Sequence, residues 1–381
     1  MLVAQVTPYP PTRNGIGDYT GDLCRALQAC DPPVDTIVLA DQADGAPREE
    51  PGVRRCWNPR EDWAQQVTHA IDELSPDVVH IQHGFHFGFG KPMMDLLQAI
   101  RQRDKGCIVT LHGVWTSSLL RRGPRRLHRA LASLADRIII HQRQGGVDRL
   151  VADGVTEPSI AIVPHGTAET PKISRAEARA KLGLSDKDRI AVFLGLVYWR
   201  KGLHTLLPAF ARAAQQVAGA KLVVAGRLRR DYPGDGLYLS RIERHVRQGQ
   251  KKGWIDWRPD HVPEELLTPY MVAADAVVFP YNRPQGSSSG VFHRALAAGR
   301  AVICSNCPTF GEAIDRWGKE LPETIAEPGS VDSWTRALVA VLGDDSLCQR
   351  AAAAATRLGQ ETSWLEVAQQ HIEIYQQASR P

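Results

Sequence analysis

The segment from Phe279 to Phe292 combines several groups that could bind a phosphate. An apolar run that reads as a strand ends at Phe279, and a helical pattern begins near Gly290. Backbone N–H groups at a helix start, serine hydroxyls and the helix dipole all favour a bound anion. The alternative is a serine N-cap on a flexible loop. We predict that a phosphate is held by Ser287, Ser288, Ser289, Gly290 and Val291.

Two adjacent cations, Arg200 and Lys201, stand before Gly202, again just after an apolar run. Two positive charges at the start of a helix suit a diphosphate. The alternative is a solvated basic pair. Because ligands of parallel sheets bind beyond the carboxyl ends of the strands, we expect these cations and the serine loop to serve the same ligand.

Histidines follow two strand candidates of the first half, His83 after one and His112 after the next. Such a side chain can act as a hydrogen-bond donor or as an acid/base group. A metal site is the alternative, but no carboxylate completes a ligand set at a recognisable spacing. We predict no metal, a catalytic role for His112, and a buried structural role for His80.

Gly15 and Gly17 follow the first strand candidate, in Asn14-Gly15-Ile16-Gly17-Asp18-Tyr19. Small residues let the backbone approach a ligand, and a helix start offers N–H groups to an anion. An ordinary strand-to-helix turn is the alternative. We predict that Gly15, Ile16 and Gly17 line a ligand-binding loop.

These candidates need a scaffold, and short apolar runs alternating with amphipathic segments indicate β-α-β units. Stripes such as Met93, Leu96, Leu97 and Ile100 predict the intervening helices. The strand candidates are Leu2 to Val6, Thr36 to Leu39, Val78 to Gln82, Cys107 to Leu111, Arg137 to His141, Ile160 to Val163, Ile190 to Leu194, Lys221 to Ala225, Ile255 to Trp257, Ala276 to Phe279 and Ala301 to Cys304.

A chain of 381 residues with 43% hydrophobic and 23% charged residues suits two globular domains. We predict an α/β fold with Rossmann-like parallel-sheet domains at 1–167 and 189–365. A polar, irregular linker is expected at 168–188, and a C-terminal helix at 366–381 that can cross back to the N-terminal domain.

Seven scattered cysteines give no disulfide framework, and no run reaches the length of a membrane span. The first residues read as a strand and not as a secretory leader. We therefore expect a cytoplasmic protein. A net charge of +4 does not indicate a nucleic-acid binder, so none is expected as a partner.

Taken together in their order, these motifs resemble the retaining glycosyltransferases of family 4, whose GT-B fold is two facing Rossmann-like domains with an interdomain cleft. The resemblance covers nearly the whole chain. It rests on Asn14 to Tyr19, Asp77 to His83, Thr110 to His112, Val163 to Gly166, Arg200 to Gly202, Val224 to Gly226 and Ala295 to Ile303.

The resemblance implies a role for each residue group. The loop of Gly15, Ile16 and Gly17 would line the diphosphate and acceptor side, and Ser288, Ser289, Gly290 and Val291 would hold phosphate and sugar. His112 would contact the transferred sugar or the acceptor, and Lys201 would neutralise the donor diphosphate with Arg200 beside it. The region of Trp257 and Arg258 matches the place where the family holds the nucleotide base. The family's paired glutamates fall at Gly286 and Arg294 here, and its arginine before the lysine falls at Leu196. Neither carboxylate is present.

The implied activity is transfer of a hexose-type sugar from a GDP- or UDP-linked donor to an acceptor hydroxyl, with retained configuration. It needs no resident cofactor, since the nucleoside-diphosphate sugar is a co-substrate. Alternatives are a sugar-nucleotide epimerase or phosphorylase of the same fold. Because the carboxylates are missing, a catalytically silent nucleotide-sugar-binding protein is a further alternative.

A basic run, Arg121-Arg122-Gly123-Pro124-Arg125-Arg126-Leu127-His128-Arg129, opens one predicted helix. One interpretation is a solvated basic face. The other is weak peripheral contact with an acidic membrane.

Overall fold

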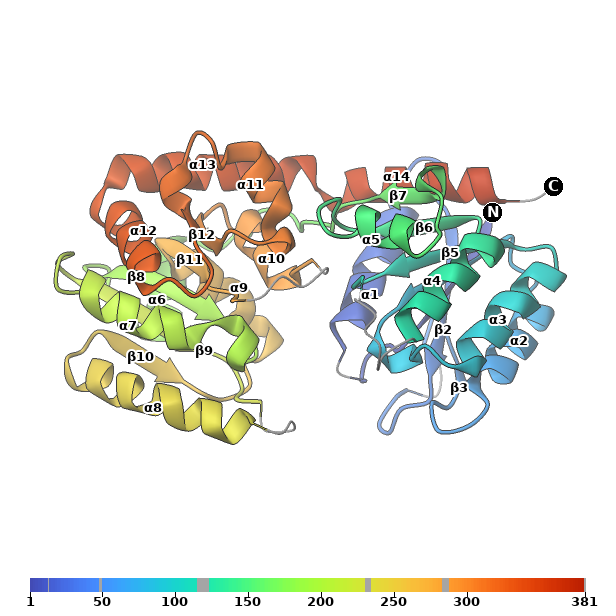
Figure 1. Ribbon diagram of the computed structural model, residues 1–381, viewed down its shortest axis with the longest axis horizontal. Coiled ribbons are helices and arrows are strands. Elements are labelled where there is room, and N and C mark those ends of the chain that lie inside the picture. Colours follow the sequence, from blue (N-terminus) through green and yellow to red (C-terminus); the bar gives the residue numbers. More distant parts are fainter. Residues whose placement is uncertain (13, 48–49, 115–122, 230–233, 283–287, 380–381) are drawn as a thin grey trace. The chain divides into compact units, whose positions relative to one another are not determined.

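The computed structural model describes residues 1–12, 14–47, 50–114, 123–229, 234–282 and 288–379 (Figure 1). The described residues group into two compact units. The first holds residues 1–166, 288–290 and 362–379, and the second holds 167–282 and 291–361.

The first unit is built on a parallel sheet with the strand order β3-β2-β1-β4-β5-β6-β7. Apolar residues alternate between its two faces, so the sheet packs against apolar side chains on both sides. Its strands are β1 (Leu2–Thr7), β2 (Asp35–Asp41), β3 (Val53–Trp57), β4 (Val78–His83), β5 (Gly106–Leu111), β6 (Arg137–Ile140) and β7 (Ile160–Ile162).

Helices cover both faces of this sheet. One core gathers α2 (Trp63–Leu74), α3 (Lys91–Gln102), α4 (Gly123–Leu134) and α5 (Val147–Ala152), and the other gathers α1 (Gly15–Gln28) and α14 (Trp364–Ala378). The predicted stripe of α3 is buried as expected. Short 3-10 turns, η1 (Phe85–Phe87) and η2 (Glu157–Ser159), complete the unit.

The second unit repeats the plan with a parallel sheet of order β10-β9-β8-β11-β12-β13 around its own core. The strands are β8 (Arg189–Leu194), β9 (Ala220–Ala225), β10 (Ile255–Arg258), β11 (Ala276–Phe279), β12 (Ala301–Ser305) and β13 (Ile325–Ala326). The helices are α6 (Arg175–Leu182), α7 (Leu203–Ala213), α8 (Asp235–Lys251), α9 (Glu264–Ala273), α10 (Gly290–Ala297), α11 (Gly311–Trp317), α12 (Val331–Gly343) and α13 (Asp345–Glu361), with 3-10 turns η3 (Trp199–Lys201), η4 (Pro308–Phe310) and η5 (Pro322–Thr324).

Every strand expected from the apolar runs is present, with ends that shift by one or two residues. Two strands escaped the sequence analysis. β3 lies at a sheet edge and carries Arg54 and Arg55, so it lacks an apolar run. β13 is only two residues long, which is too short to show a period.

The expected irregular linker at 168–188 contains a helix, which corrects that prediction. Helix α6 has a complete capping box, in which Ser174 accepts from the Glu177 N–H and Glu177 from the Ser174 N–H. Its Arg179 is fully buried and donates to the carbonyls of Ala273, Ser185 and Asp188. α6 is therefore an integral part of the second unit.

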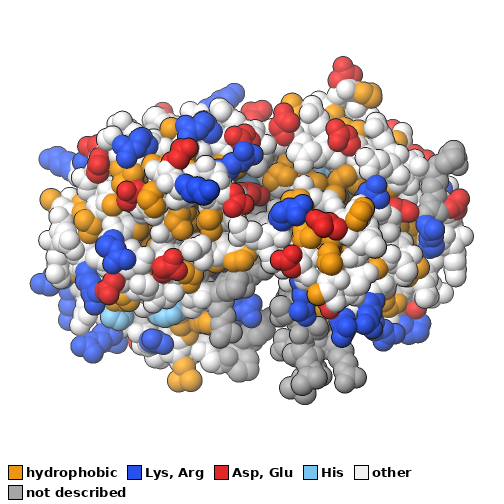
Figure 2. Space-filling model, turned by 45° about the horizontal axis from the view of Figure 1, so that its top comes forward, with side chains coloured by type: hydrophobic (Ala, Val, Ile, Leu, Met, Phe, Trp, Pro, Cys, Tyr) orange, Lys and Arg blue, Asp and Glu red, His pale blue; other side chains and the backbone are white. Residues whose placement is uncertain are grey.

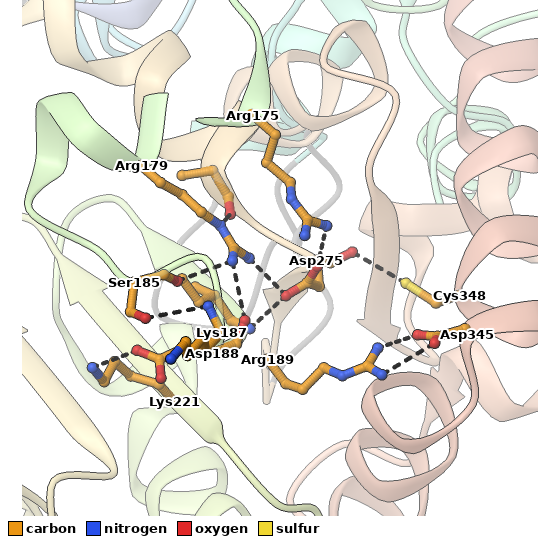
Figure 3. A network of polar contacts seen from close by, with 12 residues as sticks. Arg175, Arg179, Ser185, Lys187, Asp188, Arg189, Lys221, Asp275, Asp345 and Cys348 are labelled. Carbon is orange, nitrogen blue, oxygen red and sulfur yellow. Dashed lines mark hydrogen bonds and ion pairs between the residues drawn. The ribbon is translucent and has the colours of Figure 1, made fainter. Parts of the chain in front are cut away.

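Arg179 belongs to a polar network at the amino ends of β8, β9 and β11 (Figure 3). Its guanidinium lies 2.9 Å from Asp275, which also accepts from Arg175 at 2.7 Å and from the Ile190 N–H at 2.7 Å. Lys221 pairs with Asp188 at 2.6 Å. Ligands of parallel sheets bind at the opposite, carboxyl ends, so we assign this network to stability.

The C-terminal helix begins at Trp364, two residues before the expected start, because Ser363 caps the Glu366 N–H. α14 packs against α1 and β5 in the first unit. Gly166 makes room for it, since a Cβ there would lie 2.1 Å from the Trp364 ring.

On the face drawn in Figure 2, basic side chains lie beside acidic ones over much of the surface. None of the helices in the described ranges has the length and apolar character needed to cross a bilayer.

Candidate functional site

Histidines gather at the carboxyl edge of the first unit's sheet. His112, His141 and His165 follow β5, β6 and β7, and all three rings surround the buried Tyr19 of α1. Their centroids lie 4.8, 5.2 and 5.1 Å from the Tyr19 ring. Only His112 was predicted to act here. His141 was placed at the end of a strand candidate, and His165 stands two residues beyond the next one, so a histidine at or near a strand end was the signal available for both.

Both ring nitrogens of His112 have protein partners. Its Nε2 lies 2.8 Å from Gln82 Oε1, and its Nδ1 lies 3.2 Å from His141 Nε2. Burial lowers the pKa of His112 well below its usual value, and the neighbouring His141 and His165 lower it further. The lowered pKa leaves the ring neutral at pH 7. The residue is only half-buried, so part of it is accessible to a ligand.

His80 is fully buried within β4, as expected. Its Nδ1 lies 2.8 Å from the Tyr375 hydroxyl and its Nε2 lies 2.7 Å from Thr110 Oγ1.

The predicted glycine loop forms the first turn of α1. Asn14 already pairs two N–H groups of this turn. Its side chain accepts from Ile16 N at 2.9 Å, and its carbonyl accepts from Gly17 N at 2.9 Å. Gly15 is exposed with open space around it, whereas a Cβ on Gly17 would lie 2.6 Å from the Pro8 carbonyl oxygen. Gly15 is therefore the position that a ligand could approach, and Gly17 serves packing.

In the second unit, the Arg200-Lys201-Gly202 turn is fixed against the segment that follows β11. Gly202 has φ 76°, and a Cβ there would lie 1.6 Å from the Pro280 carbonyl oxygen. Only glycine permits this approach. Asn282 Nδ2 donates to the Trp199 carbonyl at 2.8 Å, and Asn282 N to the Arg200 carbonyl at 3.1 Å.

This arrangement holds Lys201 over an aromatic ring. Its Nζ donates to the Tyr281 hydroxyl and lies 3.8 Å from the Tyr281 ring centroid. No carboxylate among the described residues forms an ion pair with Lys201. Arg200 is exposed beside it. The turn thus offers two positive charges at the carboxyl edge of the sheet, which suits an anionic ligand.

The serine loop is described only in part. Ser287 and Gly286 lie outside the described residues, whereas Ser288 and Ser289 are described and Ser289 is buried. Helix α10 begins at Gly290, and Val291 packs within 4.0 Å of where a Gly195 Cβ would lie. Because α10 follows β11, its N-terminus lies at the same carboxyl edge as the Lys201 turn, as the topology predicts.

Arg258 is committed to contacts within its own unit. Its guanidinium donates to both Asp256 oxygens at 3.0 and 2.7 Å, to the Tyr270 hydroxyl at 3.0 Å and to the Leu182 carbonyl at 2.9 Å. The hydrogen bonds to Asp256 raise its pKa. These contacts brace β10 against α6 and α9, so they give no support to the expectation that Arg258 holds the nucleotide base.

Arg294 occupies the place where the resemblance would put a glutamate. Its guanidinium donates to Glu264 of α9 at 2.7 Å. Leu196, where the resemblance would put an arginine, is half-buried.

One acidic group escaped the sequence analysis. Glu312 in the first turn of α11 has a side chain only 17% exposed, and its carboxylate lies 3.6 Å from His293 Nε2. Burial raises its pKa to about 8. His293 Nδ1 in turn lies 2.9 Å from Thr167 Oγ1. The sequence around Glu312 has no motif, so only the fold could reveal this site.

Within the part of the chain that the structure describes, no three histidine, cysteine or acidic side chains are arranged to hold a metal ion. All seven cysteines are free thiols.

A model of the family Glycosyl transferases group 1 matches residues 174–358, and a model of the Glycosyl transferase 4-like domain matches residues 14–166. The chain therefore belongs to the group 1 glycosyl transferases.

Two relatives illustrate the range of this family. D-inositol 3-phosphate glycosyltransferase of Rhodococcus jostii (strain RHA1) is 27% identical over 253 residues, which cover 61% of this chain and 53% of that enzyme. Glycogen synthase of Mycobacterium tuberculosis is 25% identical over 323 residues, which cover 84% of this chain and 70% of that enzyme. The chain thus spans about half the length of the first relative.

Solved structures share the fold along almost the whole chain. Anabaena HepE in complex with UDP and glucose matches with a TM-score of 0.77 at 14% identity, covering 99% of each chain. An α,α-trehalose-phosphate synthase (UDP-forming) from Burkholderia xenovorans, in complex with glucose-6-phosphate, has a TM-score of 0.70 at 14% identity and covers 98% of this chain and 99% of its own. The prediction of two Rossmann-like domains of the GT-B class is confirmed.

Proposed function

We propose that this protein transfers a hexose-type sugar from a nucleoside-diphosphate sugar to an acceptor hydroxyl, with retained configuration and without a metal ion. The donor would bind the second unit through Lys201, Arg200 and the start of α10. The acceptor would bind the first unit near His112 and Gly15. Membership of the group 1 glycosyl transferases supports the reaction class.

The observation that carries this proposal is the fixed turn at Lys201. Gly202 and Asn282 hold the turn against the residues after β11, and the ammonium group has no carboxylate partner among the described residues. Cleavage of a glycosyl phosphate bond leaves negative charge on the diphosphate. A cation that is already in place stabilises that charge with little reorganisation.

The solved complexes of similar fold suggest which donors to test first. Those of HepE contain UDP or UDP-glucose. We therefore place UDP-linked hexoses ahead of GDP-linked ones, and a sugar phosphate is one acceptor to include. The cytoplasmic location also stays a prediction, which the seven free thiols favour.

The test is a panel of UDP- and GDP-linked hexoses, each incubated with the complete protein and a set of hydroxyl acceptors. We expect release of one nucleoside diphosphate and a product whose anomeric configuration matches that of the donor. Inverted product would contradict retention. A phosphorylase would instead release sugar phosphate in the presence of inorganic phosphate, and an epimerase would return an altered sugar.

A catalytically silent nucleotide-sugar-binding protein is the second candidate. The pairing of Arg294 with Glu264 favours it, because the family's second glutamate would stand at position 294. Donor binding by calorimetry without any turnover across the panel would select this candidate.

A further inference from the structure

One face of the first unit's sheet carries polar side chains where a core would ordinarily be apolar. Gln5, His80, Gln82 and Thr110 are 0% exposed. Two residues away along β1, β4 and β5, and therefore on the same face, lie Val3, Val78 and Ile108, which pack toward α1 and α14. Buried polar groups are costly unless they are paired, so each of these side chains needs a partner on that face.

The pairing begins at the carboxyl edge of the sheet. His141 Nδ1 lies 3.0 Å from the Val163 carbonyl oxygen, and its Nε2 lies 3.2 Å from His112 Nδ1. On the other side of the ring, His112 Nε2 lies 2.8 Å from Gln82 Oε1.

The chain of contacts then runs inward and ends under α14. Gln82 Nε2 lies 2.9 Å from Gln5 Oε1, and Gln5 Nε2 lies 3.0 Å from the Tyr375 hydroxyl. That hydroxyl lies 2.8 Å from His80 Nδ1, and His80 Nε2 lies 2.7 Å from Thr110 Oγ1. His112 is the one member of this series that is only half-buried, so it links the buried side chains to the carboxyl edge of the sheet.

The donors and acceptors along this hydrogen-bonded series restrict the protonation states that its members can adopt. The Val163 carbonyl can only accept, so a neutral His141 carries its proton on Nδ1 and accepts at Nε2 from His112 Nδ1–H. A neutral His112 then has a lone pair at Nε2, opposite the Gln82 oxygen. Two acceptors cannot bond. Either His112 holds a second proton, or the Gln82 amide turns so that its NH₂ group faces His112.

Turning Gln82 forces every later partner to change roles. Its oxygen would then face Gln5, so the Gln5 amide turns as well and its oxygen accepts from the Tyr375 hydroxyl. His80 must now donate to Tyr375 from Nδ1 and accept from Thr110 at Nε2. With a doubly protonated His112 the directions reverse, and His80 carries its proton on Nε2. Each of the hydrogen bonds named above keeps one donor and one acceptor in both states. Gln82 Nε2 also lies 3.4 Å from each ring nitrogen of His80, outside this series.

The groups that surround His112 decide which state prevails at neutral pH. Tyr19 of α1 contacts its ring, and His86, His80, His141 and His165 lie close enough to disfavour a positive charge. Burial has the larger effect on the pKa of His112. His371 of α14 packs beside His80 and Tyr375. The neutral state, with both amides turned, is the one expected at pH 7.

We propose that Gln82 is a positioning residue that sets the protonation state of His112, and that Gln5 and Tyr375 couple this state to the tautomer of His80. The inference rests on the proposed function only in placing His112 beside the reacting sugar. If Gln82 keeps the imidazole of His112 neutral, the charge of the diphosphate is neutralised by Lys201 alone of these two residues. A charged imidazole would change the electrostatic field at the sugar.

The test uses the complete chain labelled with ¹⁵N-histidine, because NMR distinguishes the two neutral tautomers from the imidazolium form. At neutral pH we expect His112 and His80 both to carry their single proton on Nδ1. A proton on Nε2 of a neutral His112, or on Nε2 of His80 beside a neutral His112, would overturn the proposal. This measurement needs no variant and no substrate.

A substitution tests whether Gln82 itself sets the protonation state of His112. Gln82→Glu offers only acceptors, so His112 should become doubly protonated at neutral pH, while Gln5 still donates to position 82 and His80 keeps its proton on Nδ1. Gln102→Glu on the exposed surface of α3 adds the same charge and should leave both histidines unchanged. An unchanged His112 spectrum in Gln82→Glu would refute the assignment. If Gln82→Glu does not fold, Tyr375→Phe removes the link to His80. His112 should stay neutral with its proton on Nδ1, whereas His80 should no longer be confined to its Nδ1–H form. Loss of the His112 Nδ1–H form would refute the role of Gln82, and a His80 confined to Nδ1–H would refute the coupling.

Activity provides an independent readout. In an active preparation, Gln82→Glu should lower kcat about tenfold at neutral pH with little change in KM for the donor, whereas Gln102→Glu should not. If the expected tautomers are found but no sugar is transferred, the proposed function fails and this inference stands.

Discussion

At the scale of single residues, backbone geometry fixes the position of the Lys201 charge. Gly202 approaches Pro280 so closely that no side chain could replace its hydrogen, and Lys201 is thereby held against Tyr281. An ammonium group held over an aromatic ring is partly desolvated, which strengthens its attraction for an incoming anion.

Lys201→Met should weaken binding of the nucleoside-diphosphate sugar by about 10- to 100-fold, because one charge-assisted hydrogen bond is lost. Calorimetric titration with the donor identified by the panel measures the effect. Lys187→Met removes an exposed lysine of the same unit and is the matched control. Equal affinities of the two variants would remove Lys201 from the donor site.

Glu312 should make stability depend on pH. Its folded-state pKa of about 8 lies above the ordinary 4.5, so the protonated form stabilises the fold below pH 4.5, and this stabilisation is lost as pH rises through 8. Glu312→Gln mimics the protonated acid. Its free energy of unfolding should equal that of the parent near pH 4.5 and exceed it by a few kcal/mol, on the order of the shift, at pH 9. Urea unfolding across this range is the measurement, and parallel curves for the two proteins would show that Glu312 ionises normally.

At the scale of elements, helix α6 shows how a polar segment becomes structural. Arg179 reaches three carbonyls and Asp275 from within the range expected to be a linker. The guanidinium donates to backbone carbonyls next to the amino ends of β8 and β11, so α6 is fixed at the amino edge of the second unit's sheet.

Arg179→Met should therefore lower the free energy of unfolding by about 3–5 kcal/mol, because it leaves buried partners uncompensated. Arg175→Met acts on the same carboxylate, but the Arg175 side chain is 45% exposed, and it should cost no more than about 1 kcal/mol. Chemical denaturation compares them. A similar loss in both variants would mean that burial of Arg179 adds nothing.

The basic run on α4 is partly neutralised inside the first unit. Asp153 lies 2.8 Å from His128 Nδ1 and 3.6 Å from Arg125 Nε. Arg126 and Arg129 are exposed, and Arg121 and Arg122 lie outside the described residues. Weak membrane contact stays a prediction that rests on the exposed arginines.

Co-sedimentation with anionic vesicles tests that contact. We expect weak binding at low salt that falls as salt rises, at about 1 kcal/mol for each basic residue near the surface. Replacing Arg126 and Arg129 by glutamine should reduce it, whereas replacing the exposed Arg244 and Arg247 of α8 should not. Absence of binding at low salt would leave the solvated basic face as the explanation.

At the scale of the whole molecule, sugar transfer would leave negative charge on the departing diphosphate. Either the protein or a metal ion must balance that charge. Hard divalent cations prefer clusters of oxygen ligands, and the described residues hold no such cluster of acidic side chains. Lys201, Arg200 and the start of α10 offer protein-borne positive charge in its place.

Turnover by the complete chain with both substrates should therefore persist in excess chelator, within about twofold of the untreated rate. The reason is that the proposed reaction uses no metal ion as a Lewis acid. Added Mg²⁺ should not raise it. Activity that disappears in chelator and returns with Mg²⁺ would contradict metal independence. The donor affinity measured under the same conditions separates a binding effect from a catalytic one.

The sequence alone determined the features that depend on local pattern. Apolar runs predicted the strands that form the middle of both sheets, because burial on both faces demands continuous apolar residues. The same strand ends indicated His112 and Lys201, since parallel strands align their carboxyl ends whatever the remaining packing. β3 and β13 lacked that pattern and were missed.

Only the tertiary structure decided which partners each polar side chain meets. Gln5 and Tyr375 are 370 positions apart, and Thr167 and His293 are 126 apart. Such contacts and the burial that comes with them raise the pKa of Glu312, engage the Arg258 guanidinium within its own unit, and underlie the tautomer proposed for His112. Burial and hydrogen bonding depend on distances in space, and residue types and spacing carry no record of which distant segment will cover a given side chain.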